Sequence, residues 1–105
     1  MQPLARAIIL DGQDWQTTSD FIEAVLAGVD APSWHGRNYN ALRDSFVAGS
    51  INGIEPPYDF IIKLPERPTP EVLDAVAYFA DRISEWRGEG ALLSVSIVEK
   101  SGLGN

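Results

Sequence analysis

The chain has 105 residues, of which 45% are hydrophobic, and this size and composition fit one globular domain and exclude a disordered protein. It has no cysteine, which excludes disulfides and thiolate chemistry, and its net charge of −7 opposes binding to nucleic-acid phosphates. That charge attracts a basic macromolecule, although mild acidity also simply aids solubility. The apolar run at 7–10 ends without a secretory signal, and no stretch is long and apolar enough to span a membrane. We therefore expect a soluble cytoplasmic protein.

The first elements predicted along the chain are a strand and a helix. Residues 5–10 are mostly apolar and form the strand, which a turn at 11–12 closes. A helix over 20–29 follows, with Ser19 or Thr18 as its N-cap. The apolar residues that recur at helical spacing on one face are Phe21, Ile22, Val25, Leu26 and Val29.

A loop and a short second helix come next. Residues 31–37 form the loop, in which Gly36 is expected to supply a turn with positive φ. Asn38 caps the helix, which runs to about Val47. Its predicted inner side consists of Ala41, Leu42, Ser45 and Phe46. Residues 48–57 are rich in Gly, Ser, Asn and Pro and form an irregular connection.

The remaining half of the chain predicts a strand, a long helix and a last strand. The strand covers 58–64. Thr69 then caps a helix with Pro70 at its first position, and the glycines after residue 87 end it. Along this helix the apolar face consists of Val72, Val76, Phe79, Ile83 and either Trp86 or Arg87. The last strand covers 92–98.

The order β-α-α-β-α-β predicts an α/β fold, because helical segments connect consecutive strands and such connections join parallel strands. We expect a three-stranded parallel sheet packed with three to four helices, which right-handed crossovers place against its faces. There is no internal repeat. The sequence thus predicts a single domain over 5–99 and a flexible tail over 100–105.

Catalytic and metal-binding patterns are scarce. The single histidine, His35, has Ser33 or Ser45 with Asp44 as its nearest candidate partners for a catalytic triad, but nearness in sequence is weak support. His35, Asp44 and Glu85 have no recognisable metal-ligand spacing. We therefore expect no enzyme, no metal and no cofactor, and we expect His35 to be a loop residue that is exposed or used at a contact.

One segment, 32–44, combines features of a binding surface. An aromatic loop tip at Trp34 leads into the helix capped by Asn38, and that helix carries Asp44. A large aromatic side chain beside an acid is typical of a binding hot spot. The alternative is structural: Trp34 packs into the core, Asn38 is only a cap and Asp44 is solvated.

The same segment has the pattern Pro-x-aromatic-x-Gly-x-Asn-x-x-Ala-Leu-x-Asp, which resembles the signature of the barstar family of ribonuclease inhibitors. The strand 7–12 before it and the helix end and strand at 83–90 and 94–98 also look similar. The resemblance covers about residues 5–99. It implies a proteinaceous inhibitor whose loop and second helix plug the active site of a small basic ribonuclease.

The resemblance also implies roles for individual residues. Asp44 takes the place of the aspartate that mimics the substrate phosphate, and Trp34 that of the aromatic that stacks on the enzyme's catalytic histidine. Gly36 lets the loop pass closely, and Glu85 matches an outlying acid that meets a basic residue of the enzyme. The partner-binding residues expected on this basis are Trp34, His35, Gly36, Asn38, Asn40, Arg43, Asp44 and Glu85.

The sequence departs from the family pattern at two site positions. Asn40 replaces the second acid of the helix face, and Arg43 stands where an aromatic is common. The connection 48–57 is longer than usual, and 65–70 is too short for the family's small extra helix. The expected partner is thus a small basic ribonuclease or a nuclease toxin, bound one to one by a monomer. The alternative is a regulatory module of the same fold that binds a protein other than a nuclease.

Overall fold

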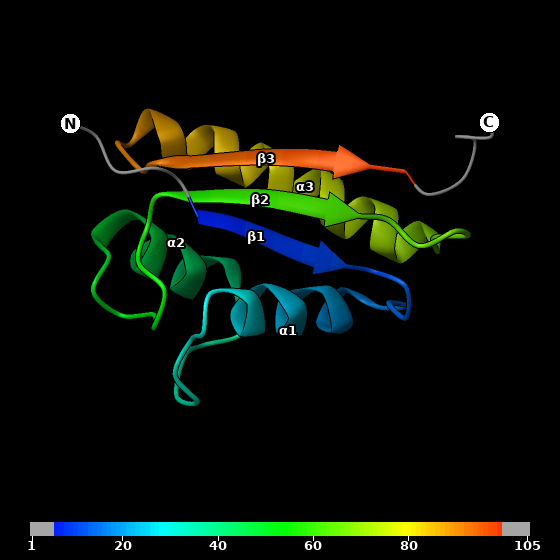
Figure 1. Cartoon of the computed structure of the whole chain (residues 1–105), viewed down its shortest axis with the longest axis horizontal. Helices are drawn as coiled ribbons and strands as arrows, with labels where there is room; N and C mark the ends of the chain where they lie inside the picture. Colours follow the sequence, from blue (N-terminus) through cyan, green and yellow to red (C-terminus); the bar gives the residue numbers. More distant parts are fainter. Residues whose placement is uncertain (1–5, 100–105) are drawn as a thin grey trace.

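Three parallel strands form one sheet in the order β1-β2-β3 (Figure 1). They are β1 (Arg6–Asp11), β2 (Tyr58–Lys63) and β3 (Leu93–Val98), so the predicted three-stranded parallel sheet is confirmed. The computed structural model describes residues 6–99, and the predictions for residue 5 and for a flexible tail over 100–105 lie outside them.

Between residues 6 and 99 there are three helices: α1 (Thr18–Gly28), α2 (Tyr39–Ala48) and α3 (Pro70–Gly88). Thr69 caps α3 as predicted, since its hydroxyl accepts the backbone N–H of the third helical residue at 3.1 Å. In this part of the chain no helix is both long and apolar enough to cross a membrane.

The helix N-caps were predicted correctly for α2 but not for α1. Asn38 Oδ1 accepts the N–H of Ala41 at 2.8 Å, so the predicted cap of α2 is confirmed. In α1 the cap is Thr17, and the prediction of Ser19 or Thr18 is wrong. Thr17 and Asp20 form a capping box, in which each side chain accepts the other's backbone N–H at 3.1 Å. This reciprocal pair satisfies two N–H groups of the helix start, which a cap at Ser19 would leave open.

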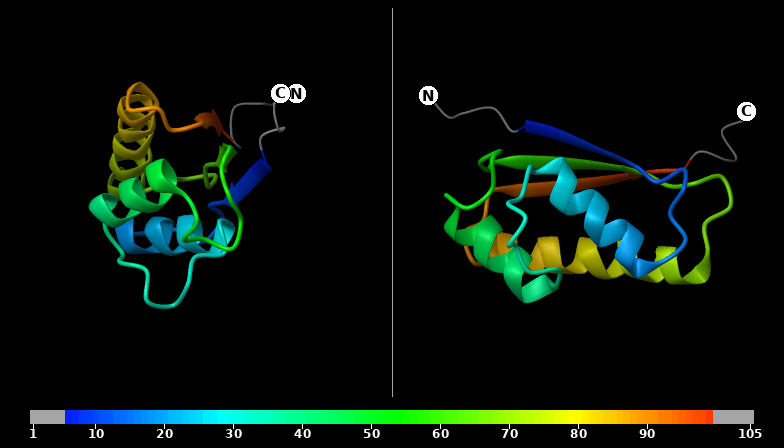
Figure 2. Two further views of the ribbon diagram at one scale, coloured as in Figure 1. Left: turned by 90° about the vertical axis from the view of Figure 1, so that its left-hand side faces the viewer. Right: turned by 90° about the horizontal axis from the view of Figure 1, so that it is seen from below.

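All three helices lie on the same side of the sheet (Figure 2). We expected the helices to pack against the faces of the sheet, and they cover only one of its two faces. The strand order explains why: each crossover adds the next strand on the same side of the last, so right-handed connections all cross the same face. One face of the sheet therefore carries no helix.

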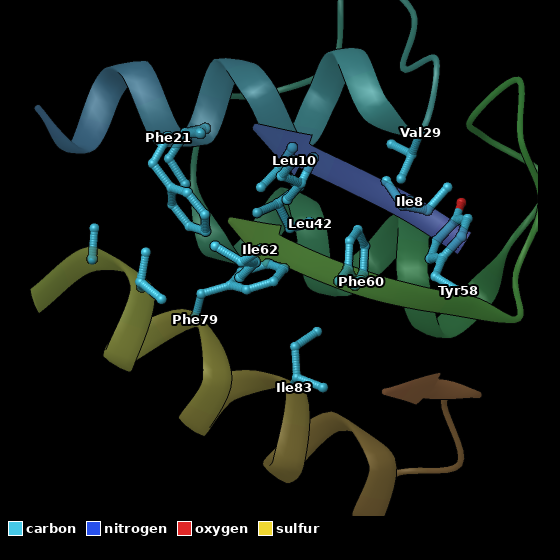
Figure 3. Close-up of a cluster of buried hydrophobic side chains, with 14 of the residues drawn as sticks. Ile8, Leu10, Phe21, Val29, Leu42, Tyr58, Phe60, Ile62, Phe79 and Ile83 are labelled. Atoms are coloured by element: carbon cyan, nitrogen blue, oxygen red, sulfur yellow. The ribbon is translucent and has the colours of Figure 1, made fainter. Parts of the chain in front are cut away.

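The core fills the space between the sheet and this single helical layer (Figure 3). Strand β2 contributes three fully buried side chains, Tyr58, Phe60 and Ile62, and the aromatic ring of Phe60 packs against those of Phe46 and Phe79. On α3 the buried residues include Trp86, whereas Arg87 is exposed. In helix α2 the residues Leu42, Ser45 and Phe46 are buried, as predicted for its inner side, whereas the fourth predicted residue, Ala41, is only partly buried.

Candidate functional site

The loop before α2 and helix α2 itself lie toward the end of the molecule at which the strands begin (Figure 1). The irregular loop passes directly into the helix at the Asn38 cap, so side chains from loop and helix share one surface. Phe46 on the inner side of α2 packs against Tyr58 and Trp86, which fixes the helix to the sheet and to the end of α3. The outer surface of α2 therefore has a rigid support.

The indole of Trp34 projects from the loop into solvent, with 73% of the residue exposed. The alternative that Trp34 packs into the core is therefore wrong. Next to it is a hollow of about 130 Å³, whose lining includes Trp34, Gly36, Asp44 and Ile51. Ligand pockets usually measure about 300–1,000 Å³, so this hollow suits one side-chain head group of a partner better than a small-molecule ligand.

His35, the neighbour of Trp34, has the opposite environment. It is only 4% exposed, so the expectation of an exposed ring is wrong. Its Nδ1 donates to the carbonyl of Gly36 at 2.7 Å, and its Nε2 lies 3.0 Å from the hydroxyl of Ser45 on α2. The buried ring thus connects the loop to the inner side of α2. In this arrangement Trp34 stays at the surface, and the side chain of His35 is not accessible to a partner.

A chain of buried polar groups continues from this contact. Asn52 Nδ2 donates to the hydroxyls of Ser45 at 3.1 Å and Tyr58 at 3.3 Å, and the Tyr58 hydroxyl donates to the carbonyl of Ile54. Buried polar groups connected in this way fix a single arrangement of the segments that carry them. The loop, α2 and the connection to β2 are therefore held together by one network.

This network also bears on the catalytic and metal hypotheses. His35 and Ser45 do meet, but both are buried, and a carbonyl instead of Asp44 accepts from Nδ1. The arrangement lacks the accessible nucleophile and the orienting acid of a hydrolase triad. Among residues 6–99 no group of three His, Asp or Glu side chains is placed to hold a metal, so His35, Asp44 and Glu85 do not form a site.

Gly36 is required for close approach and not for an unusual backbone angle. The predicted positive φ is wrong: among the described glycines only Gly49 and Gly90 have one. A Cβ on Gly36 would lie 3.0 Å from the Cβ of Ala41 and 3.2 Å from the amide nitrogen of Asn38. The loop therefore passes so near the start of α2 that a side chain here must push neighbours aside.

The two charged residues at the centre of the α2 surface, Arg43 and Asp44, differ in their exposure and in their ion pairs. The carboxylate of Asp44 is 70% exposed, and its nearest cation is the Arg43 guanidinium at 3.7 Å. Arg43 turns toward the end of α3, where it donates to Glu89, and this hydrogen bond holds the pKa of the guanidinium above its usual value. Asp44 thus keeps most of its accessible surface beside Trp34, and Arg43 stays charged.

The surface continues from α2 onto α3. Glu85 lies one turn before Glu89 and pairs with Arg82 at 2.9 Å, and Arg82 also lies over the ring of Tyr78 at 5.0 Å. The ring of Tyr78 packs edge-on against that of Tyr39 at the start of α2, with centroids 4.7 Å apart. Glu85, which was predicted to bind the partner, lies close enough to Arg43 to help raise the pKa of its guanidinium. Asn40, another predicted binding residue, is exposed on α2.

Four residues of this surface were missed by sequence reasoning, namely Ile51, Tyr78, Arg82 and Glu89. Arg82 lies three residues before Glu85, and Glu89 at the C-cap of α3 lies four residues after it. Tyr78 lies four residues before Arg82, so helical spacing from Glu85 would have found them. Ile51 gives no such signal, because it belongs to an irregular connection.

A larger hollow of about 590 Å³ lies at the other end of the sheet, where β1 and β2 end. Its lining includes Asp14, Glu66 and Arg67, all of which are exposed. These side chains have mixed charge, and none of them forms an ion pair with another of the described residues 6–99. The assignment of a function therefore rests on the surface around Trp34, which has a rigid support.

No known family model matches the chain, and no curated protein is significantly similar to it.

Proposed function

We propose that this protein inhibits a small basic ribonuclease or nuclease toxin in the cytoplasm, by inserting the Trp34 loop and the outer surface of α2 into the enzyme's active site. One chain blocks one enzyme. The protein itself supplies no catalytic group, metal or cofactor, and its charge of −7 keeps it away from nucleic acid.

The observation that carries the proposal is that the exposed indole of Trp34 and the exposed carboxylate of Asp44 line the same hollow of about 130 Å³. Aromatic anchors that are exposed in the free protein and desolvated on binding are the usual hot spots of protein interfaces. Because the buried ring of His35 already fixes the loop, little ordering entropy is lost on association.

Charge supports a basic partner. A ribonuclease active site binds phosphate with cationic side chains, and the carboxylate of Asp44 offers the same charge to those groups. The excess of acids over bases steers a cationic enzyme toward the surface and speeds the encounter. Arg43 does not oppose this, because its charge is balanced by Glu89 at the edge of the surface.

A second candidate is a regulatory module that binds a protein other than a nuclease. It is favoured by the two arginines of the surface, Arg43 and Arg82, which give it mixed charge, and by Asn40, which carries none. A uniformly cationic cleft would offer these arginines no acceptor beyond Glu89 and Glu85 of the same chain.

The deciding experiment titrates the RNA-cleaving activity of a panel of small basic ribonucleases with the pure protein. We expect complete inhibition of at least one enzyme, with an end point at one chain per enzyme. Trp34→Ala must weaken that inhibition, whereas Leu73→Ala, which removes an exposed apolar side chain near the start of α3, must leave it unchanged. If an excess of the pure protein inhibits no enzyme of the panel, the proposal is wrong and the second candidate is favoured.

A further inference from the structure

The face of the sheet that carries no helix (Figure 2) is unusual for parallel strands, which almost always have both faces covered. Its central row consists of Ile9, Ile61 and Ser96, which are register partners across the three strands. Ile9 is 57% exposed, and Ile61 is partly exposed. An apolar centre on an uncovered parallel sheet indicates a surface that a further protein layer covers.

Three charged residues lie on this face: Asp59 and Lys63 on β2, and Asp11 at the end of β1, where it is the register partner of Lys63. On the central strand, Asp59 and Lys63 lie two residues before and two residues after Ile61, and all three point away from the core. A strand rises about 3.3 Å per residue, so the two charges lie roughly 13 Å apart with Ile61 midway. Asp59 accepts a hydrogen bond from Ser94 at 2.8 Å, whereas Lys63 forms no ion pair with any of the described residues 6–99.

This pattern is complementary to itself. We infer that the open face of the sheet binds a second copy of this chain through a two-fold axis that crosses the strands at Ile61, so that Asp59 of each copy meets Lys63 of the other. In such an isologous contact each residue pair occurs twice.

The two-fold axis along the strands would instead place Asp59 on Asp59 and Lys63 on Lys63. In the antiparallel arrangement Asp11 of each copy lies over Ala7 of the other, because the axis also passes Ile9, so Asp11 does not face another acid directly. Charge therefore favours the antiparallel arrangement.

The size of the face sets the strength of the contact. Three strands of six residues cover roughly 300 Å² per copy, since strands lie about 4.8 Å apart. A stable interface buries about 800 Å² per partner. The expected dimer is therefore weak and reversible.

The proposed nuclease-binding surface is not involved. The segment that joins α1 to α2 lies on the helix side of the molecule, away from the open face (Figure 2). Each copy of the dimer thus keeps its Trp34 loop free, and the inference neither needs nor supports the inhibitor function.

Sedimentation velocity of the full chain from micromolar to millimolar concentration tests the dimer. The wild type must show a rise in average mass with concentration. Ile61→Lys must abolish that rise, while Leu73→Lys, which adds the same charge at an exposed apolar position of α3, must keep it. A wild type that stays monomeric at millimolar concentration overturns the inference, as does equal association of both lysine variants.

Charge reversal tests the arrangement and contains its own control for folding. Asp59→Lys and Lys63→Asp must each raise the dissociation constant at least tenfold, because two like-charged pairs then face each other. An equimolar mixture of the two variants restores both attractive pairs and must associate at least as strongly as wild type, which a misfolded variant cannot do. Failure of the mixture to associate, with both variants folded by circular dichroism, refutes the antiparallel pairing.

Discussion

Replacement of His35 by alanine will destabilise the protein although it lies in a surface loop. The ring is buried, and it makes two hydrogen bonds, to the carbonyl of Gly36 at 2.7 Å and with the hydroxyl of Ser45 at 3.0 Å. Each such bond contributes about 1 kcal/mol, and the unfilled space left by the ring adds a similar cost. We therefore expect His35→Ala to lower the free energy of unfolding by about 2–4 kcal/mol.

The adjacent residue is the matched control. Because Trp34 is 73% exposed, Trp34→Ala will change the free energy of unfolding by less than about 0.5 kcal/mol. Urea unfolding followed by far-ultraviolet circular dichroism measures both values without relying on tryptophan fluorescence. If His35→Ala is as stable as wild type while Trp34→Ala loses more than about 1 kcal/mol, the packing of the loop is the reverse of that described.

Three further predictions concern the support of the site and its surroundings. The backbone N–H groups of Gln16 and then Thr17 hold the pKa of Asp20 below its usual value. This carboxylate therefore stabilises the fold above about pH 4, and the stabilisation is lost as pH falls through the lowered pKa. Asp20→Asn will reduce the fall of the melting temperature with decreasing pH, which thermal melts at a series of acidic pH values measure. Burial first, and the neighbouring Tyr78 second, raise the pKa of Tyr39 to about 12. The contribution of Tyr39 to stability is therefore complete below about pH 10 and declines toward about pH 12. Tyr39→Phe will remove that decline in stability, and it will remove one late-titrating phenol from the ultraviolet titration. Gly36→Ala will lower the urea midpoint by the equivalent of about 1–2 kcal/mol, because the new Cβ would lie 3.0 Å from a side-chain carbon of α2; an unchanged midpoint would show that the loop can move aside.

Local sequence signals predicted the elements of the fold, because each has its own apolar period and flanking turn residues. The Asn38 and Thr69 caps followed from their position before an apolar helical repeat, and both are confirmed. The cap of α1 was missed because three hydroxyl residues stand in a row, and only the reciprocal contact with Asp20 selects Thr17. The single helical layer was missed because it depends on strand order, which no local period encodes.

At the candidate site, sequence reasoning identified the segment but not the environment of each side chain. Trp34 and His35 are neighbours in a loop, where no period separates an exposed residue from a buried one. The burial of His35 depends on Ser45, ten residues farther along the chain, and on Asn52, seven residues beyond Ser45. The orientation of Arg43 depends in turn on Glu89 at the end of another helix. These long-range contacts decide which groups face a partner.

The most direct test of the central claim is the dissociation rate of the complex with an inhibited ribonuclease, compared between wild type and Asp44→Asn. Loss of one charge from a desolvated pair costs about 2–5 kcal/mol, so the variant must dissociate roughly 30-fold faster or more. Asp14→Asn, which removes an exposed acid at the other end of the sheet, must leave the rate unchanged. Equal dissociation rates for wild type and Asp44→Asn would contradict the account.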